Sequence, residues 1–339
     1  MFRFKLLFLL YSILLFSCTN QPGLDLQPEA ISTTVVIQEG IFLPAEMLVH
    51  EDLLLITDRS NNPSVSIFQI TDEETYKPIK QLGREGRGGG EFLAPNTLLF
   101  NKHTNKVYVF DIGGRKLVPI NQQLEFETNS EKIIEMNGMP DGIHAISDSA
   151  YAITGIFVGA RFGLFENTGY SLKETATFGE FEPTGIELNS FHEAAAWRSG
   201  SVYSESSQKL VLFNRYANRA ELYDLHGNLL TYHESPTHGK PKAEYVNDEF
   251  VFSDDAIVSY ISVAADNDRI FALYSGKSYN SETSGEGNLV HVFDWDLNLV
   301  TILELDHDSI SITVDEKSGL YSIQNSADVA IRFAQLHDM

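Results

Sequence analysis

The residues of this sequence best suited to binding chemistry are arginines in expected loops. Ten arginines follow residue 17, and seven of them separate short apolar runs: Arg59, Arg84, Arg87, Arg115, Arg161, Arg215 and Arg219. A guanidinium carries a rigid fork of donors that binds a carboxylate or a phosphate bidentately. In a chain with a net charge of −23, this set of arginines predicts a site for an anionic group.

The same arginines also allow a structural interpretation. An arginine that opens an expected strand, as Arg115 and Arg219 do, could pair with the Asp or Asn that ends the strand before it. Arg84 and Arg87 are less tied to this repeat, because they lie in the glycine-rich segment GREGRGGGEF. That segment lacks the GK[ST] ending of a phosphate-binding loop and no helix follows it, so a turn is predicted there. Arg84 and Arg87 are therefore the favoured ligand contacts.

Histidine and aromatic residues supply the remaining candidates. The ten histidines show no HxxxH or HExxH spacing, so neither a metal nor a cofactor is predicted. His144 and His192 lie near expected inner strands and could line a channel, with a hydrogen-bonded core histidine as the alternative. Tyr216 and Trp197 could stack on a sugar or a peptide, with core packing as the alternative. No GxSxG is present, and the run from Asp294 lacks the Gly and Glu of a calcium loop.

The N-terminus carries a secretory signal with a lipidation site. Residues 1–17 combine two positive charges with an apolar run too short for a comfortable membrane span. The segment Leu15–Cys18 resembles the bacterial lipobox, and Cys18 is the one cysteine of the chain. Acyl chains on Cys18 would hold the protein on a membrane without spanning it. Residues 18–30 are then expected to form a flexible tether, and residues 31–339 the folded domain.

Composition limits the class of protein and of partner. Without residues 1–17 the net charge is −25, and such a surface repels nucleic acid and anionic lipid head groups. A single cysteine allows no intramolecular disulfide, so stability must come from packing. Short runs rich in β-branched and aromatic residues, separated by turn residues, predict an all-β fold.

The expected strands group into six sets. They span residues 45–82, 96–135, 142–178, 193–234, 258–306 and 309–336. The first strand of the fourth set is expected at 193–199, with SVYSE (201–205) as a further candidate strand. The sixth set has three strands instead of four, while the segment 32–40 belongs to no set. A four-stranded sheet cannot bury both of its faces alone, whereas six sheets arranged radially can. The sequence therefore predicts a six-bladed β-propeller, closed by the N-terminal strand that completes the last blade.

One segment carries a family resemblance. GREGRGGGEFLAP, followed by KVYVFD and GGRKLVPI, resembles an NHL-type repeat, and the lipobox with a propeller resembles the lipid-anchored, six-bladed TolB-like propellers of Gram-negative bacteria. This resemblance implies a fold and an extracytoplasmic location on the periplasmic or outer-membrane face. It implies little chemistry, because propellers include binding modules, lyases and lactonases.

Two classes of function follow from this sequence. The first is a non-catalytic, lipid-anchored propeller that binds an unknown ligand or protein partner at its loop-rich face, where the arginines gather. The second is a lactonase- or lyase-like enzyme with its site in the central channel. Such an enzyme needs several carboxylates, Asn or His within about 5–6 Å of each other at the channel mouth.

Overall fold

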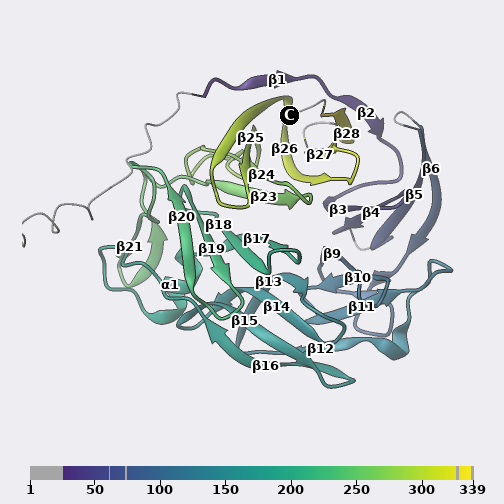
Figure 1. Ribbon diagram of the computed structural model, residues 1–339, viewed down its shortest axis with the longest axis horizontal. Coiled ribbons are helices and arrows are strands. Elements are labelled where there is room, and N and C mark those ends of the chain that lie inside the picture. The colour runs from purple at the N-terminus through teal and green to yellow at the C-terminus, as the bar shows by residue number, and fades with distance from the viewer. Residues whose placement is uncertain (1–25, 61, 73–74, 326–327, 337–339) are drawn as a thin grey trace, which may run out of the picture.

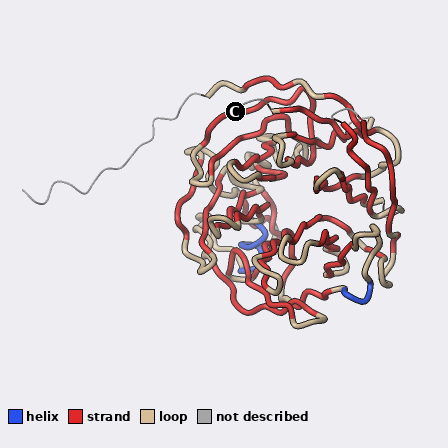
Figure 2. Tube along the Cα trace, turned by 45° about the vertical axis from the view of Figure 1, so that its right-hand side comes forward, coloured by secondary structure: helices blue, strands red, loops and turns tan. Residues whose placement is uncertain are grey.

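The structure is a computed structural model that describes residues 26–60, 62–72, 75–325 and 328–336. Its main strands form six antiparallel blades arranged in a ring around a central axis (Figures 1 and 2). Blades 2 and 3 are joined into one eight-stranded sheet by a parallel pair of strands, and blades 5 and 6 form another. The predicted six-bladed, all-β propeller is confirmed.

The first four blades each contain four strands in sequence order. Blade 1 consists of β3 (Pro44–His50), β4 (Leu53–Asp58), β5 (Val65–Asp72) and β6 (Thr75–Leu82). Blade 2 consists of β9 (Pro95–Asn101), β10 (Lys106–Asp111), β11 (Lys116–Ile120) and β12 (Lys132–Glu135). Blade 3 consists of β13 (Gly138–Ala145), β14 (Ala150–Phe157), β15 (Ala160–Asn167) and β16 (Ser171–Phe178). Blade 4 consists of β17 (Ser199–Ser204), β18 (Lys209–Asn214), β19 (Arg219–Asp224) and β20 (Leu229–Glu234).

The last two blades share one long strand. Blade 5 consists of β23 (Tyr260–Ala265), β24 (Arg269–Tyr274), β25 (Gly287–Asp294) and the first half of β26 (Leu299–Val314). Blade 6 consists of the second half of β26, β27 (Gly319–Asn325), β28 (Val329–Gln335) and β2 (Thr34–Ile37). Smaller elements lie between the blades: β7 (Arg84–Glu85), β8 (Glu91–Phe92), η1 (Thr128–Ser130), α1 (Ser190–Ala196), β21 (Ala243–Val246) and β22 (Glu249–Phe252).

The N-terminal segment closes the ring as the sequence predicts. β2 pairs antiparallel with β28, and β1 (Glu29–Ile31) adds a parallel pairing to β26 (Figure 1). Thr33, which lies between these two strands, accepts from Arg332 Nε and donates to Asp306 Oδ1, both at 2.6 Å through its hydroxyl. β1 begins at Glu29, two residues before the predicted start of the propeller domain.

The core consists of six apolar clusters, one between each pair of neighbouring blades. The cluster at the closure joins Ile37 and Met47 to Ile323 and Ile331, so the first and last parts of the chain share one interior. Each blade thus buries both of its faces, as the radial arrangement requires.

One predicted strand is wrong. The segment at 193–199 contains most of helix α1, because its three consecutive alanines favour a helix. Asn189 caps the helix by accepting from the backbone N–H of His192 at 2.9 Å. The inner strand of blade 4 is β17, which starts at Ser199 and contains most of the candidate segment 201–205, and Arg198 lies at the entry to that strand.

Candidate functional site

The candidate site lies at the end of the ring where the loops between second and third strands meet the connections between blades. Arg59 follows β4 of blade 1, and its Nη2 donates to Oδ1 of Asn96 in β9 at 2.5 Å. Arg198 precedes β17 of blade 4 and donates through Nε and Nη2 to the two carboxylate oxygens of Asp141 in β13, each at 2.6 Å. The inner strands of blades 2 and 3, the entry to that of blade 4 and the loop after the second strand of blade 1 thus direct side chains toward one mouth of the channel.

A third arginine completes the cluster. The pKa of Arg59 is lowered, mainly by burial of its guanidinium and against the opposing effect of Glu46. The positive charges of Arg198 and Arg215 lower it further, so both of these arginines lie near Arg59. Arg215 follows β18, and its backbone N–H donates to the carbonyl of Arg198 at 2.8 Å. Within the described ranges its guanidinium has neither an ion pair nor a hydrogen bond. We call Arg59, Arg198 and Arg215 the mouth arginines.

The carboxyl of Glu46 offsets little of the positive charge of the mouth arginines. Glu46 lies on the innermost strand β3, and burial raises its pKa to about 8, against the opposing effect of Arg59. At neutral pH this carboxyl is mostly protonated and carries little charge. The pKa of Arg198 is raised overall. Burial acts to lower it, but the hydrogen bonds with Asp141 and the charge of that carboxylate raise it more. Among the described residues, the ion pair between Arg198 and Asp141 is thus the one that the three guanidiniums form, on a chain with a net charge of −23.

Aromatic side chains form a platform next to the mouth arginines. The ring of Tyr216 lies 4.2 Å from that of Phe252 and 5.8 Å from that of Tyr279, and Phe252 and Tyr279 are 4.7 Å apart between ring centroids. Tyr216 also raises the pKa of Arg198, which places its hydroxyl beside that guanidinium. Tyr279 is 38% exposed, and its backbone N–H donates to the carbonyl of Ala256 at 2.9 Å, which fixes its loop.

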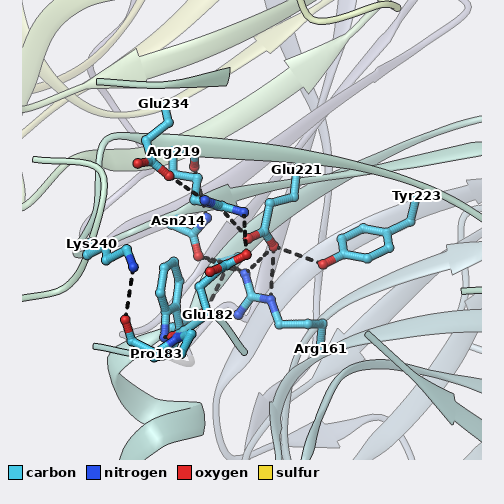
Figure 3. A network of polar contacts seen from close by, with 11 residues as sticks. Arg161, Glu182, Pro183, Asn214, Arg219, Glu221, Tyr223, Glu234 and Lys240 are labelled. Carbon is cyan, nitrogen blue, oxygen red and sulfur yellow. Dashed lines mark hydrogen bonds and ion pairs between the residues drawn. The ribbon is translucent and has the colours of Figure 1, made fainter. Parts of the chain in front are cut away.

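Two predicted ligand residues, Arg161 and Arg219, lie in a buried network instead (Figure 3). Glu221 accepts from Arg161 Nε at 3.0 Å through one oxygen and from Arg219 Nε at 2.8 Å through the other. Arg161 also donates to Oδ1 of Asn214 at 2.7 Å, and Arg219 pairs with Glu234. The side chains of both arginines are only 3% exposed. These two residues follow the structural interpretation, because their positive charges are neutralised inside the protein.

In blades 1 and 2, the pairing expected between an arginine and the Asp or Asn that ends the strand before it is replaced by another contact. Asp58 accepts from the backbone N–H of Phe42 at 2.7 Å, and Asp111 accepts from that of Ala94 at 2.7 Å. Each of these carboxylates therefore binds the backbone of the segment that leads into its blade, and not the guanidinium of the arginine that follows it in the sequence. Arg115 is exposed and donates to the carbonyl of Met136 at 3.3 Å.

Arg84 and Arg87 lie apart from the mouth arginines. Arg84 is 74% exposed and donates to Glu91 Oε1 through Nε at 2.9 Å and Nη2 at 2.7 Å. Glu91 in turn accepts from the backbone N–H of Gly88 at 2.8 Å, so the glycine-rich loop is closed on itself. Arg87 is exposed. No contact within the described part of the chain joins either arginine to Arg59 or Arg215.

Of the two predicted channel histidines, the structure places one in the channel. His144 lines a cavity of about 1110 Å³, and its Nε2 lies 2.7 Å from Ser201 Oγ. Burial lowers the pKa of His144 to about 4, so it is neutral at physiological pH. His192 was predicted next to a strand but belongs to α1, where it stacks on Phe250 at 4.7 Å. Trp197 is 1% exposed and belongs to the core, which is the alternative interpretation of that residue.

The cavity that His144 lines opens at the opposite mouth. Its walls include the turns after the first strand of five blades and the end of that strand in blade 3, and in an antiparallel blade these lie at the other end from the turns after the second strand. Eight acidic and two lysine side chains line it. Among the described residues, no group of three or more His, Cys, Asp or Glu is arranged to hold a metal ion.

Sequence reasoning missed four residues of the site: Glu46, Arg198, Phe252 and Tyr279. Arg198 was hidden by the incorrect strand at 193–199, since a helix there places it at the entry to an inner strand. The two aromatic residues lie in a hairpin and in a long loop outside the blade repeat, and only the folded chain brings them to Tyr216.

Comparisons with known proteins agree with this architecture. The family described as TolB-like 6-blade propeller-like matches residues 27–317. Two solved structures resemble the fold at low sequence identity. One is the β-propeller domain of Cps50 (Swd1) from Myceliophteria thermophila, with 12% identity, a TM-score of 0.53, and coverage of 89% of this chain and 99% of that one. The other is a Bacteroides fragilis protein described as exported, with 11% identity, a TM-score of 0.58, and coverage of 90% and 94%. No curated protein matches the sequence.

The N-terminal predictions concern residues outside this description. Cys18 and the signal at 1–17 lie outside the described residues. Within the described part of the chain, none of the helices is long and apolar enough to cross a membrane.

Proposed function

The chain belongs to the TolB-like six-bladed propeller family, and from that premise we propose that it is a lipid-anchored, extracytoplasmic protein that binds an anionic ligand without catalysing a reaction. The acyl chains on Cys18 would supply the anchor. The export described for the Bacteroides fragilis neighbour supports the same side of the membrane for this chain.

One observation carries the binding function: the mouth arginines converge from blades 1 and 4, and among the described residues only Arg198 has an ion-pair partner, Asp141. Guanidiniums held close together repel one another, so an anion that neutralises their charge also relieves this repulsion. A charge-assisted hydrogen bond contributes about 1.5–3 kcal/mol, and partial burial favours the upper part of that range. Arg59 and Arg215 are the expected contacts of the anion, because Nε and Nη2 of Arg198 already donate to the carboxylate of Asp141.

The test is equilibrium binding of three anions, citrate, inorganic phosphate and methyl β-D-glucuronide, measured by titration calorimetry. We expect at least one of them to bind to the native protein and to lose about tenfold or more in affinity in the Arg59→Gln/Arg215→Gln variant. The matched control is Arg84→Gln/Arg87→Gln, which removes the same charge from exposed positions and should bind as the native protein does. Failure of all three anions to bind, or equal binding by the mouth variant, would contradict the proposed function.

A further inference from the structure

The mouth arginines and the aromatic platform lie side by side, so a ligand at this mouth contacts both. Arg215 and Tyr216 are neighbours on the loop after β18, and the ring of Tyr216 leads through Phe252 to Tyr279. A small anion such as phosphate would use the guanidiniums and leave the rings uncovered. A ligand that uses the whole surface needs a negative group at one end and an apolar ring face at the other.

The surroundings of the platform are polar rather than apolar. Tyr279 lies between Ser278 and Asn280, which are both exposed. The amide of Asn280 donates to Oδ1 of Asp254 at 3.3 Å, so donors and acceptors border the edge of the ring. An aromatic acid presents no hydroxyl groups to such an edge, whereas a sugar presents several around its ring and an apolar C–H face toward the aromatic residue.

From this juxtaposition we propose that the ligand is an acidic sugar, whose carboxylate binds Arg59 and Arg215 while its pyranose ring stacks on Tyr279 and Tyr216. This inference rests on the proposed function and names the ligand class of the same site. The carboxylate can be held bidentately by a guanidinium. The loop of Tyr279 is fixed before binding, because Tyr279 N–H donates to Ala256 and Gly276 N–H donates to Val258, both at 2.9 Å. A fixed platform reduces the cost of ordering side chains on binding.

The experiment compares four probes on the native, full-length protein by saturation-transfer NMR and calorimetry. Methyl β-D-glucuronide has the ring and the charge, methyl β-D-glucoside has the ring alone, propionate has the charge alone, and benzoate has the charge on an aromatic ring. We expect the glucuronide to bind at least tenfold more tightly than each of the other three.

Variants test which side chains supply the ring contact. Tyr279→Ala should weaken glucuronide binding about tenfold and leave propionate binding unchanged, and Tyr279→Leu, which keeps apolar volume without an aromatic face, should show most of the same loss. The control is Tyr170→Ala, at a tyrosine that is 85% exposed on a turn of blade 3 and outside the site. Melting temperatures close to that of the native protein would confirm that both Tyr279 variants are folded.

Each other outcome has a defined meaning. Equal affinity for propionate and the glucuronide, or glucuronide binding that Tyr279→Ala does not change, would overturn the acidic-sugar inference and leave anion binding in place. Tighter binding of benzoate would overturn the sugar in favour of an aromatic acid. Equal binding of the neutral glucoside would overturn the role of the carboxylate. If none of these probes binds, nor citrate nor phosphate, the proposed function itself fails.

Discussion

The replacement Glu221→Gln separates the structural arginines from the ligand-binding ones. Glu221 is buried between two guanidiniums, at 3.0 Å from Arg161 Nε and 2.8 Å from Arg219 Nε, and also accepts from the hydroxyl of Tyr223 at 3.2 Å. Glutamine keeps the shape of the side chain but removes its charge. It leaves Arg161 without an ion-pair partner among the described residues, and it leaves Arg219 with Glu234 and the more distant Glu182.

The magnitude follows from this burial. Removing one member of a buried ion pair costs about 3–5 kcal/mol, because the remaining charge stays out of water. A domain has a net stability of only about 5–15 kcal/mol. For a chain of this size about 2 °C of melting temperature corresponds to 1 kcal/mol, so we expect Glu221→Gln to lower the melting temperature by roughly 6–10 °C.

Thermal unfolding followed by circular dichroism measures this effect, with Arg84→Gln as the matched control. Arg84 forms an ion pair of similar length but is 74% exposed, so its loss should cost no more than about 1 kcal/mol. Replacing the whole triad by apolar residues, as Arg161→Met/Glu221→Leu/Arg219→Met, should recover only part of the loss, because Glu234 then loses its arginine partner and buried Asn214 loses a donor. A Glu221→Gln protein that melts within about 2 °C of the native one would refute this reasoning.

Three further predictions concern the anchor, the closure and the carboxyl of Glu46. Cys18→Ser should move the protein from the membrane to the soluble fraction, and unchanged membrane fractionation would exclude lipidation at this residue. Deleting residues 31–39 removes β2 and should abolish most of the net stability of about 5–15 kcal/mol, so an undiminished cooperative melt would contradict closure at this place. Because the pKa of Glu46 is raised from 4.5 to about 8, the stability it contributes is fully present below pH 4.5 and is lost as the pH rises to about 8. As the pH rises from 5 through 7 to 9, the free energy of unfolding should therefore fall less in Glu46→Gln than in the native protein. If the free energies of the two proteins change with pH in parallel, the pKa of Glu46 is not raised.

The fold could be predicted from the sequence because it depends on local patterns. Strand rhythm, turn residues and the orphan strand at 32–40 determine the number of blades and the place of closure, and β2 pairs where the incomplete sixth set requires it. The one wrong element, at 193–199, is a short segment in which alanine propensity and the Asn189 cap favour a helix.

The site was less accessible to sequence reasoning, because burial and partner choice depend on neighbours far apart in the chain. The sequence predicts Arg161 and Arg219 in loops like that of Arg215, yet both open third strands of blades and are neutralised by Glu221 and Glu234, whereas Arg215 has no such neighbour among the described residues. The favoured pair Arg84 and Arg87 stands on a loop closed by Glu91, away from the mouth. Which arginines remain available is a property of the assembled ring and not of any motif.

Arginine footprinting tests the central claim most directly, because it reports which guanidiniums an anion covers. Phenylglyoxal modifies accessible arginines, and mass spectrometry measures the rate at each one with and without the tightest-binding of citrate, phosphate and methyl β-D-glucuronide. We predict that the anion slows modification of Arg215 several-fold, leaves Arg84 and Arg87 unchanged, and finds Arg161 and Arg219 unreactive in both cases. Protection of Arg84 and Arg87 with no change at Arg215 would contradict a binding site at the mouth arginines.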